Sequence, residues 1–546
     1  MNKFGQKLDG HFKIRERGST FSTEVIAGVT TFLAMAYILV VNPSTITGNL
    51  GEVANPAASL WNSVYLATAL GAFVGTLLTA LLANVPYAQA PGMGLNSQMQ
   101  LVLVGFAGAG GYVFGGAVAI VFLSGALFLA FTLIPCGRDK ETGELINIRE
   151  KIFEGIPAGI RGAIPVGIGL FIAFIGLQNA GIVKAQDGIK VDLVNFTHLF
   201  VEGTDTALAK GAVVFLFGLI VIAILSKFRV KGSVLIGILA ATVIGIPFGV
   251  TDVNVITNAE DWKFWEKFAD FFSRDPEKGT FFMFDFANAF RGEAVMSTIM
   301  LIITFCMIDM FDTIGTLIGC ATKANLMDNR GKPIGFKRAM FADAAATVAG
   351  ACFGTSTVTT FVESGTGVAE GGKTGFASVI TALLFLAAIF ILPVFKVIPS
   401  AAAACGLVYV GVLMMSTVTN VDFSDVRVAV PAFLTIAGMP FFYSITDGIG
   451  IGLISYVVIN IICYAIDMII WSVRTKKIAA ASVNAAPAAA DSAPVDGEGT
   501  IVSDADAPAA EAAAPAVPEK PKWTISVVTG IIVVLFLVMY LVPLAV

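Results

Sequence analysis

Long apolar segments alternate with short polar ones along almost the whole chain. A helix needs about 20 apolar residues to cross the hydrocarbon core of a bilayer. By this criterion the sequence predicts fourteen membrane-spanning segments. In chain order they cover residues 23–42, 61–84, 88–106, 111–134, 158–183, 211–228, 232–250, 294–320, 339–356, 358–372, 374–399, 401–420, 428–446 and 448–471. The pattern is that of an all-α polytopic membrane protein.

Two of these segments, the third and the tenth, are interrupted by glycine, proline and polar residues. The interruptions lie at 87–98 and 354–372, seven segments apart. A matched pair of broken segments in two halves of a chain indicates a 7+7 inverted repeat with a binding site near the bilayer midplane. Irregular backbone at this depth is tolerated only where protein or a water-filled cavity surrounds it. The alternative is a pair of kinked helices with small residues at their contact.

The composition excludes most soluble classes of protein. Only 13% of the 546 residues are charged and 56% are hydrophobic, whereas soluble domains carry about 25% charged residues. Soluble enzymes and nucleic-acid-binding proteins are therefore excluded, and the lipid bilayer is the expected surroundings. Most Lys and Arg fall in the connections on the side of the basic N-terminus. This bias predicts a cytoplasmic N-terminus and a multi-pass protein of the inner (plasma) membrane.

Acidic residues within the apolar segments are the candidate functional residues. Asp309 and Asp312 are spaced i, i+3 in the eighth segment and so share a helical face. Glu363 lies in the broken tenth segment. A charge at a helix centre costs about 2.5–3.5 kcal/mol on insertion scales, which favours positions facing the bundle interior or a cavity. Such carboxylates could accept hydrogen bonds from the N–H edge of a neutral heterocycle, take up a proton, or cap broken backbone.

Other polar residues are open to both structural and functional interpretations. Asn96 could cap a half-helix or contact a substrate, and we favour the contact. Asp343, Asp447 and Asp467 lie nearer the ends of their segments, where a structural role is favoured. The sequence has no Ser/His/Asp set, no phosphate-binding loop and no metal-ligand cluster. It therefore predicts no enzyme and no metal. No Lys or Arg accompanies the acids, which disfavours an anionic substrate.

Five stretches of the chain resemble a known family. They are 31–39 with 41–43, Ala90 to Asn96, Phe171 to Val183, Phe311 to Leu317, and Gly354 to Gly375. The sequence resembles the azaguanine-type purine permeases, a branch of the nucleobase–cation symporter-2 superfamily related to the bacterial uracil permease. The resemblance covers about residues 1–470 in order. One departure is the polar stretch at 97–100, where the family pattern leads us to expect apolar or aromatic residues.

The resemblance implies a fold and a division of the chain. A core domain would comprise spans 1–4 and 8–11, and a gate domain spans 5–7 and 12–14. The predicted regions are 1–22 (cytoplasmic segment), 23–134 and 294–399 (core), 158–250 and 401–471 (gate), 251–293 (extracytoplasmic amphipathic loop), 478–522 (disordered Ala/Pro/acidic linker) and 523–546 (C-terminal apolar helix). A homodimer through the gate domain is implied as well.

The resemblance also implies a function. The chain would be a secondary active transporter importing purine nucleobases by proton symport, through elevator-like alternating access. The purine would be bound by Asn96, Asp312, Glu363 and Ser364. The coupling proton would be carried by Asp309, Asp312 or Glu363, with no other cofactor. The choice among guanine, hypoxanthine and adenine is left open. The alternatives are an anion channel or exchanger on the same fold, and a nucleobase receptor that does not transport.

Overall fold

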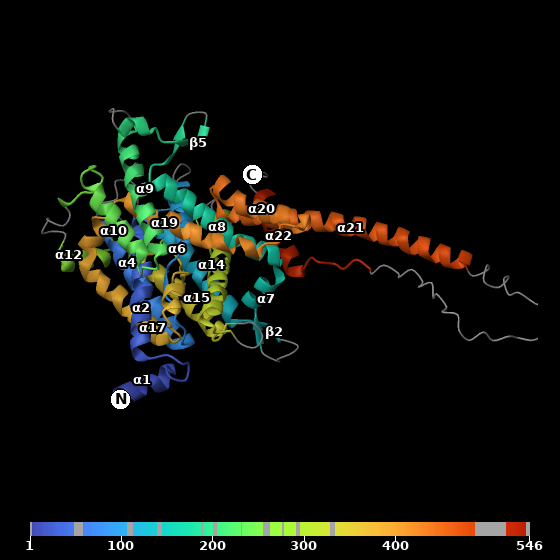
Figure 1. Ribbon diagram of the computed structural model, residues 1–546, viewed down its shortest axis with the longest axis horizontal. Helices are drawn as coiled ribbons and strands as arrows, with labels where there is room; N and C mark the ends of the chain where they lie inside the picture. The colour runs from blue at the N-terminus through green and yellow to red at the C-terminus, as the bar shows by residue number, and fades with distance from the viewer. Residues whose placement is uncertain are drawn as a thin grey trace, which may run out of the picture.

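Helices dominate the computed structural model, and they follow the apolar segments of the sequence (Figure 1). The structure describes residues 3–47, 58–105, 113–138, 145–186, 189–199, 205–230, 232–254, 262–275, 278–290, 295–327, 333–485 and 520–541. By length and composition, nine helices of this part of the chain could cross a membrane, and three shorter apolar helices accompany them. The prediction of a helical, multi-pass membrane protein is confirmed, whereas the count of fourteen spans stays a prediction.

The first half of the chain runs from the N-terminal helix to the seventh predicted segment. Its elements are α1 (Lys3–Phe12), α2 (Phe21–Met35), α3 (Ile38–Thr47), α4 (Ala58–Leu78), the π-helical turn η1 (Thr79–Ala83), β1 (Gln89–Pro91), α5 (Met93–Gly105), α6 (Phe114–Leu133), β2 (Pro135–Arg138), β3 (Leu145–Asn147), α7 (Ile148–Gly155), α8 (Ala158–Asn179), β4 (Val183–Gln186), β5 (Ile189–Leu193), η3 (Phe196–Leu199), α9 (Thr206–Lys227) and α10 (Ser233–Gly245).

The second half of the chain runs from the helix after the seventh predicted segment to the C-terminal helix. Its elements are α12 (Phe264–Phe271), α13 (Phe286–Ala289), α14 (Val295–Ala324), α15 (Phe336–Phe353), β6 (Val358–Thr360), α16 (Ser364–Ala369), α17 (Gly375–Ala388), η6 (Ile389–Ile391), α18 (Leu392–Lys396), α19 (Ser400–Met415), η7 (Ser416–Asn420), α20 (Val426–Phe441), α21 (Ile445–Ala485) and α22 (Val527–Leu541).

The two broken segments meet in the interior. Strands β1 and β6 pair in antiparallel register, with Gln89 opposite Thr360 and Pro91 opposite Val358. Beyond the strands, the amide of Phe361 donates to the carbonyl of Ala88 at 3.0 Å. Each broken segment therefore satisfies backbone groups of the other, as buried backbone requires. In each half a short helix, α5 or α16, follows the strand after a short connection.

The membrane helices pack in two groups. In one group α15 lies against α4 and α6, and α17 lies against α2 and α4. In the other, α8 lies against α19 and α20, while α9 contacts α10 and α19. Fewer contacts cross between the groups, and they join α2 to α10, α3 to α19, and α5 and α14 to α8. Glycine allows close approach within the second group, since a Cβ at Gly169 would lie 2.8 Å from the carbonyl oxygen of Gly411.

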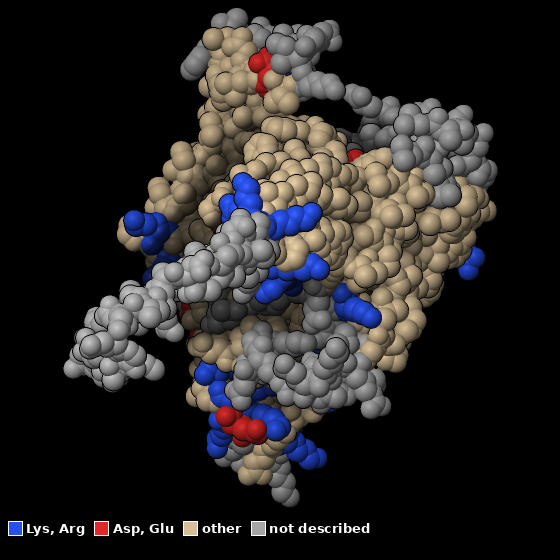
Figure 2. Space-filling view, turned by 90° about the vertical axis from the view of Figure 1, so that its right-hand side faces the viewer, with Lys and Arg blue, Asp and Glu red and all other residues tan. Residues whose placement is uncertain are grey.

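The surface agrees with a membrane setting. Figure 2 shows wide areas without any charged side chain, with Lys and Arg gathered in patches between them. Large apolar side chains are exposed on α9, α20 and α21, among them Ile220, Phe433 and Ile469. Such a surface would be costly in water and suits a lipid environment.

The C-terminal region differs from the prediction in one respect. Helix α21 extends to Ala485, past the predicted end of the last span at 471, and leaves the body of the molecule (Figure 1). Residues 479–485 include four alanines, which favour helix. The helix thus takes up the start of the predicted linker 478–522, whose residues 486–519 lie outside the described residues. Helix α22 lies within the predicted apolar segment 523–546.

Candidate functional site

One cavity lies between the two groups of helices and is lined by two carboxylates. Its volume is about 40 Å³, and it is partly open to its surroundings. The first group supplies residues from the start of α5, from α14 and from the connection between β6 and α16, whereas the second supplies residues of α8 and α19. The lining residues are Gly92, Met93, Gly94, Ile168, Ile172, Asp312, Thr316, Thr360, Phe361, Val362, Glu363, Val410 and Met414.

Asp312 reaches the cavity from α14. Glycine at position 92 leaves room beside it, because a Cβ there would lie 3.7 Å from the Oδ2 atom of Asp312 and 2.6 Å from the Cγ2 atom of Thr359. The glycine of the broken third segment thus lets the start of α5 lie closely against Thr359 of β6, beside the acid of α14.

Glu363 directly precedes α16 and is 5% exposed. Its Oε1 atom accepts a hydrogen bond of 2.6 Å from the hydroxyl of Tyr37. Tyr37 lies in the break between α2 and α3, a break that the apolar pattern did not predict. Sequence reasoning missed this tyrosine as a site residue, although it belongs to the family-like stretch 31–39.

Two expected binding residues contact protein and do not line the cavity. The hydroxyl of Ser364 accepts a hydrogen bond of 3.0 Å from the amide of Ala88, and so joins the two broken segments. Asn96 is buried, and its Oδ1 accepts a hydrogen bond from the hydroxyl of Ser356. Their role as binding residues stays a prediction.

Asp309 lies away from Asp312. It is fully buried, and its Oδ2 atom accepts a hydrogen bond of 2.9 Å from Thr347 of α15. Three residues along a helix leave the two side chains roughly 60° apart. This angle is enough for Asp312 to face the cavity while Asp309 faces α15.

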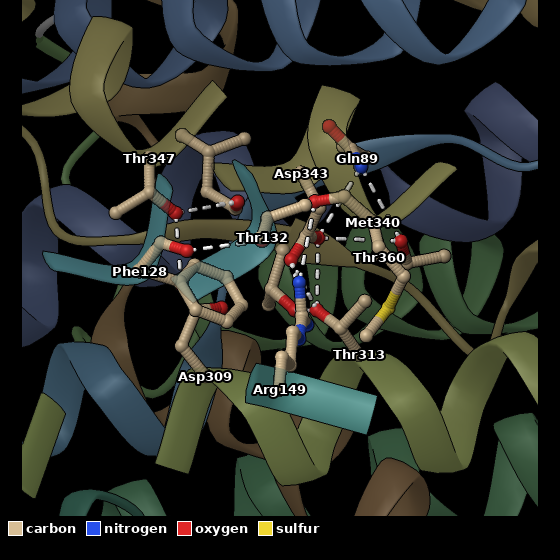
Figure 3. Close-up of polar contacts among 12 residues, drawn as sticks. Gln89, Phe128, Thr132, Arg149, Asp309, Thr313, Met340, Asp343, Thr347 and Thr360 are labelled. Atoms are coloured by element: carbon tan, nitrogen blue, oxygen red, sulfur yellow. Dashed lines mark hydrogen bonds and ion pairs between the residues drawn. The ribbon is translucent and has the colours of Figure 1, made fainter. Parts of the chain in front are cut away.

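A buried cluster around Asp309 forms behind the cavity wall (Figure 3). Asp343 of α15 lies in it, fully buried, at an ion-pair distance of 3.5 Å from Arg149 of α7. Neither residue lines the cavity. The structural role expected for Asp343 agrees with this ion pair. Arg149 was missed, because nothing in its polar sequence surroundings separates it from an arginine of an ordinary connection.

Among the described residues, no group of three or more His, Cys, Asp or Glu is placed to hold a metal ion. The lining of the cavity also contains neither Lys nor Arg. The chemistry of the cavity therefore rests on two carboxylates, two threonines and apolar side chains.

Comparison with known proteins gives the family. The model of the Permease family matches residues 22–463. The chain belongs to this family. The permease is 35% identical over 461 residues to the adenine permease AdeP of Escherichia coli, a match that covers 83% of this chain and 90% of that one. It is 37% identical over 456 residues to the guanine/hypoxanthine permease PbuG of Bacillus subtilis, and this match covers 82% of the present chain and 92% of PbuG. The protein is a transporter and not an enzyme.

Solved structures show that the permease shares its fold with other membrane transporters. The transmembrane domain of the cyanobacterial bicarbonate transporter BicA matches with a TM-score of 0.53 at 14% identity, covering 77% of the permease and 96% of that domain. The murine anion transporter Slc26a9 in its inward-facing state matches with a TM-score of 0.50 at 11% identity. This match covers 85% of the permease and 73% of Slc26a9. At this identity the likeness concerns the fold alone.

Proposed function

We propose that this permease carries a purine nucleobase, bound in the cavity between Asp312 and Glu363. The observation that carries the proposal is that both acids line one cavity between two packed groups of helices. The relatives named for adenine and for guanine/hypoxanthine transport support the substrate class. Whether guanine, hypoxanthine or adenine is preferred is left to the experiment below.

The lining suits a flat neutral heterocycle. A purine presents N–H donors at its edge, and carboxylates accept such donors strongly. Its two faces are apolar, and Ile168, Ile172 and Phe361 offer apolar contact. A few placed polar groups in a largely apolar pocket are typical of small-molecule sites. We therefore assign recognition of the N–H edge to Asp312 and Glu363, with Tyr37 orienting the latter.

Proton symport is the coupling mode that we propose. Two ionised carboxylates without a cation in the lining carry net negative charge that is costly to hold at membrane depth. Uptake of a proton reduces this charge. The permease would then need no bound cofactor beyond the proton, with Asp309, Asp312 and Glu363 as the candidate carriers.

Elevator-like movement is the conformational change that we propose. The core domain would be 23–134 with 294–399, and the gate domain 158–250 with 401–471. The separate packing of the two groups supports this division. In one group α15 contacts α4 and α6, and α17 contacts α4, whereas in the other α8 contacts α19 and α20, and α9 contacts α19. A cavity at the boundary would open to either side when one group slides past the other.

The test is uptake of radiolabelled hypoxanthine into proteoliposomes under an inward proton gradient. Unlabelled adenine, guanine, xanthine and uracil serve as competitors. We expect accumulation that purines block and that stops when the gradient is collapsed. The Glu363→Gln and Asp312→Asn variants should lose it, whereas Asp422→Asn, which changes an exposed acid outside the cavity, should retain it. Full proton-driven uptake by both cavity variants would refute the assignment.

The same preparation tests the two alternatives. An anion channel or exchanger would give anion flux that is insensitive to Glu363→Gln. A nucleobase receptor would bind purine without transport and would use the predicted linker 478–522 to contact a partner. Normal uptake after deletion of 486–519 removes the reason for the receptor hypothesis.

We further propose that the permease lies in the plasma membrane, with a cytoplasmic N-terminus and an extracytoplasmic 251–293 loop. We also propose that it forms a homodimer through the gate domain. The bias of Lys and Arg along the sequence supports the orientation. Helix α12, with Trp265 exposed, suits an interfacial position of the loop. Reporter fusions at each end and crosslinking of α9 or α20 test these points.

A further inference from the structure

Arg149 enters the core of the permease from a connecting helix. It is the second residue of α7, which joins α6 to α8, and it is 1% exposed. Its Nη1 atom donates a hydrogen bond of 3.2 Å to the carbonyl of Met340. Its guanidinium carbon lies 3.7 Å from the centre of the Phe128 ring (Figure 3). The side chain is thus held by α6 and α15, two helices of the proposed core.

The guanidinium stays charged at neutral pH. Burial lowers the pKa of Arg149 to about 10, while the charges of Asp343 and Asp309 raise it. One cation therefore lies beside two carboxylates. The ion pair of 3.5 Å joins Nη2 to the Oδ2 atom of Asp343, and both oxygens of Asp343 also accept from the hydroxyl of Thr313 at 2.8 Å.

Asp309 is the acid without such partners. One hydrogen bond, from Thr347, reaches its Oδ2 atom, and its buried Oδ1 atom has no partner in the described part of the chain. Two nitrogens of Arg149, Nε and Nη2, also make no hydrogen bond there. A buried acceptor left unpaired destabilises the folded protein, and more so when it is charged. A proton on Asp309 would remove the charge and supply a donor.

The cluster is connected to the substrate cavity. Thr360 lines the cavity, and its hydroxyl donates to the Oδ1 atom of Asp343 at 3.5 Å. Gln89 bridges the same two residues, with Nε2 lying 3.3 Å from that Oδ1 atom and 3.4 Å from the hydroxyl of Thr360. Polar contacts therefore lead from the cavity through Thr360 to Asp343 and Arg149 (Figure 3).

We propose that Asp309, together with the Arg149–Asp343 ion pair, is the site that binds the coupling proton, separate from the two acids that bind the purine. The proton adds to the carboxylate of Asp309 on one side of the membrane and leaves to water on the other. The charge of the three residues changes from −1 to 0. In the part of the chain that the structure describes, Cys306 and Asp312, both on α14, are the other titratable groups that act on Asp309. The proposal rests on the proposed function, because it assigns a step of that transport.

Two transport assays separate proton coupling from purine binding. Exchange of labelled for unlabelled hypoxanthine without a gradient needs the purine site alone. Accumulation under a gradient of about one pH unit needs coupling, and symport of one proton supports about tenfold accumulation. We expect Asp309→Asn to keep exchange and to lose accumulation. Glu363→Gln should lose both, and the exposed control Asp422→Asn should keep both.

Conservative variants distinguish positioning from a structural role. Asp309→Glu keeps a carboxyl and should retain accumulation. Arg149→Lys keeps the cation and should retain part of the accumulation. Arg149→Met leaves two acids without a cation and should abolish accumulation. If Asp309→Asn is folded and accumulates hypoxanthine as the parent does, the proposal is wrong. It is equally wrong if that variant loses exchange and accumulation together.

A readout that does not depend on transport completes the test. Infrared difference spectra of the reconstituted permease between alkaline and neutral buffer report carboxylic acid groups by their C=O stretch. A band that is absent from Asp309→Asn and present in Glu363→Gln supports the assignment, and a band unchanged by Asp309→Asn overturns it. If the parent exchanges no purine, the proposed function fails, and this band still reports whether Asp309 binds a proton.

Discussion

The hydroxyl of Tyr37 lies 2.6 Å from the Oε1 atom of Glu363, although 326 positions separate the two residues in the sequence. The tyrosine comes from the break in the first apolar segment and the acid from the break in the tenth. Two interruptions of regular helix therefore combine to orient one carboxylate at the wall of the cavity. This hydrogen bond gives the first prediction.

Tyr37→Phe should weaken purine binding. Without this hydrogen bond the Glu363 side chain must be ordered when the purine binds, which costs about 0.5–1.5 kcal/mol and corresponds to a loss of affinity of about two- to tenfold. The measurement is the concentration of unlabelled purine that halves labelled uptake. Tyr65→Phe is the matched control, because Tyr65 is also fully buried but donates to the carbonyl of Ala388, away from the cavity. Equal affinity in the two variants would contradict the proposed role of Tyr37.

Gly92→Ala should impair the permease, and a second substitution should correct it. The added Cβ would lie 2.6 Å from the Cγ2 atom of Thr359 and 3.0 Å from the Cδ1 atom of Leu95. Overpacking of this kind typically costs about 1–3 kcal/mol. Thr359→Ser removes the clashing methyl group and keeps the hydroxyl that bonds Thr313.

The measurement for this pair is the midpoint of thermal unfolding in detergent together with purine uptake. The double variant Gly92→Ala/Thr359→Ser should recover much of the stability and uptake lost by Gly92→Ala. Thr359→Ser alone should change both only slightly. No recovery in the double variant would mean that the close contact between β6 and the start of α5 does not limit function.

The architecture was largely predictable, because its signals are local in sequence. Long apolar segments specify the helices, and Gly and Pro mark where the third and tenth segments break. The sequence predicted that the two broken segments share a site near the bilayer midplane, but it did not predict their antiparallel pairing through β1 and β6. The interior position of Asp312 and Glu363, which line the cavity, was predictable, since an acid within an apolar segment is costly anywhere except in the interior.

The rest of the site depended on contacts between distant parts of the chain. Tyr37 could not be recognised, because an aromatic residue in an apolar segment is usual. Arg149 lies in a polar connection, and only the fold carries it between α6 and α15. The spacing of Asp309 and Asp312 gave one helical face, but the neighbours of α14 decide which acid meets the cavity.

Met414→Trp should block transport by filling the cavity from the side of α19. Met414 lines the cavity and is partly exposed, so a larger side chain can be placed without rebuilding the protein interior. Met415→Trp is the control, because this neighbour is equally half-buried and does not line the cavity. We expect purine exchange to fall by about tenfold or more in the first variant and to persist in the second. Similar exchange rates in both would place the substrate elsewhere.

The C-terminal helix α22 is expected to stabilise the permease without taking part in transport. It lies beyond the family match, which ends at 463. The hydroxyls of Ser526, just before the helix, and of Thr529 within it both donate to the carbonyl of Gly155 at 2.6 Å. Tyr540 donates to the Oδ1 atom of Asp447 at 3.0 Å. Through these hydrogen bonds α22 contacts α7 and α21.

A matched pair of glycine substitutions tests the packing of α22 on α21. A Cβ at Gly450 of α21 would lie 2.6 Å from the hydroxyl of Tyr540 and 2.7 Å from the ring of Phe536, whereas a Cβ at Gly530 of α22 would meet nothing within 4 Å. Gly450→Ala should lower the midpoint of thermal unfolding by a few degrees, because it displaces α22, and it should leave purine uptake in place. Gly530→Ala should not lower the midpoint, since alanine favours helix over glycine. Equal midpoints in the two variants would mean that α22 does not pack on α21 in the detergent-solubilised protein. Loss of uptake in Gly450→Ala alone would mean that α22 contributes to transport.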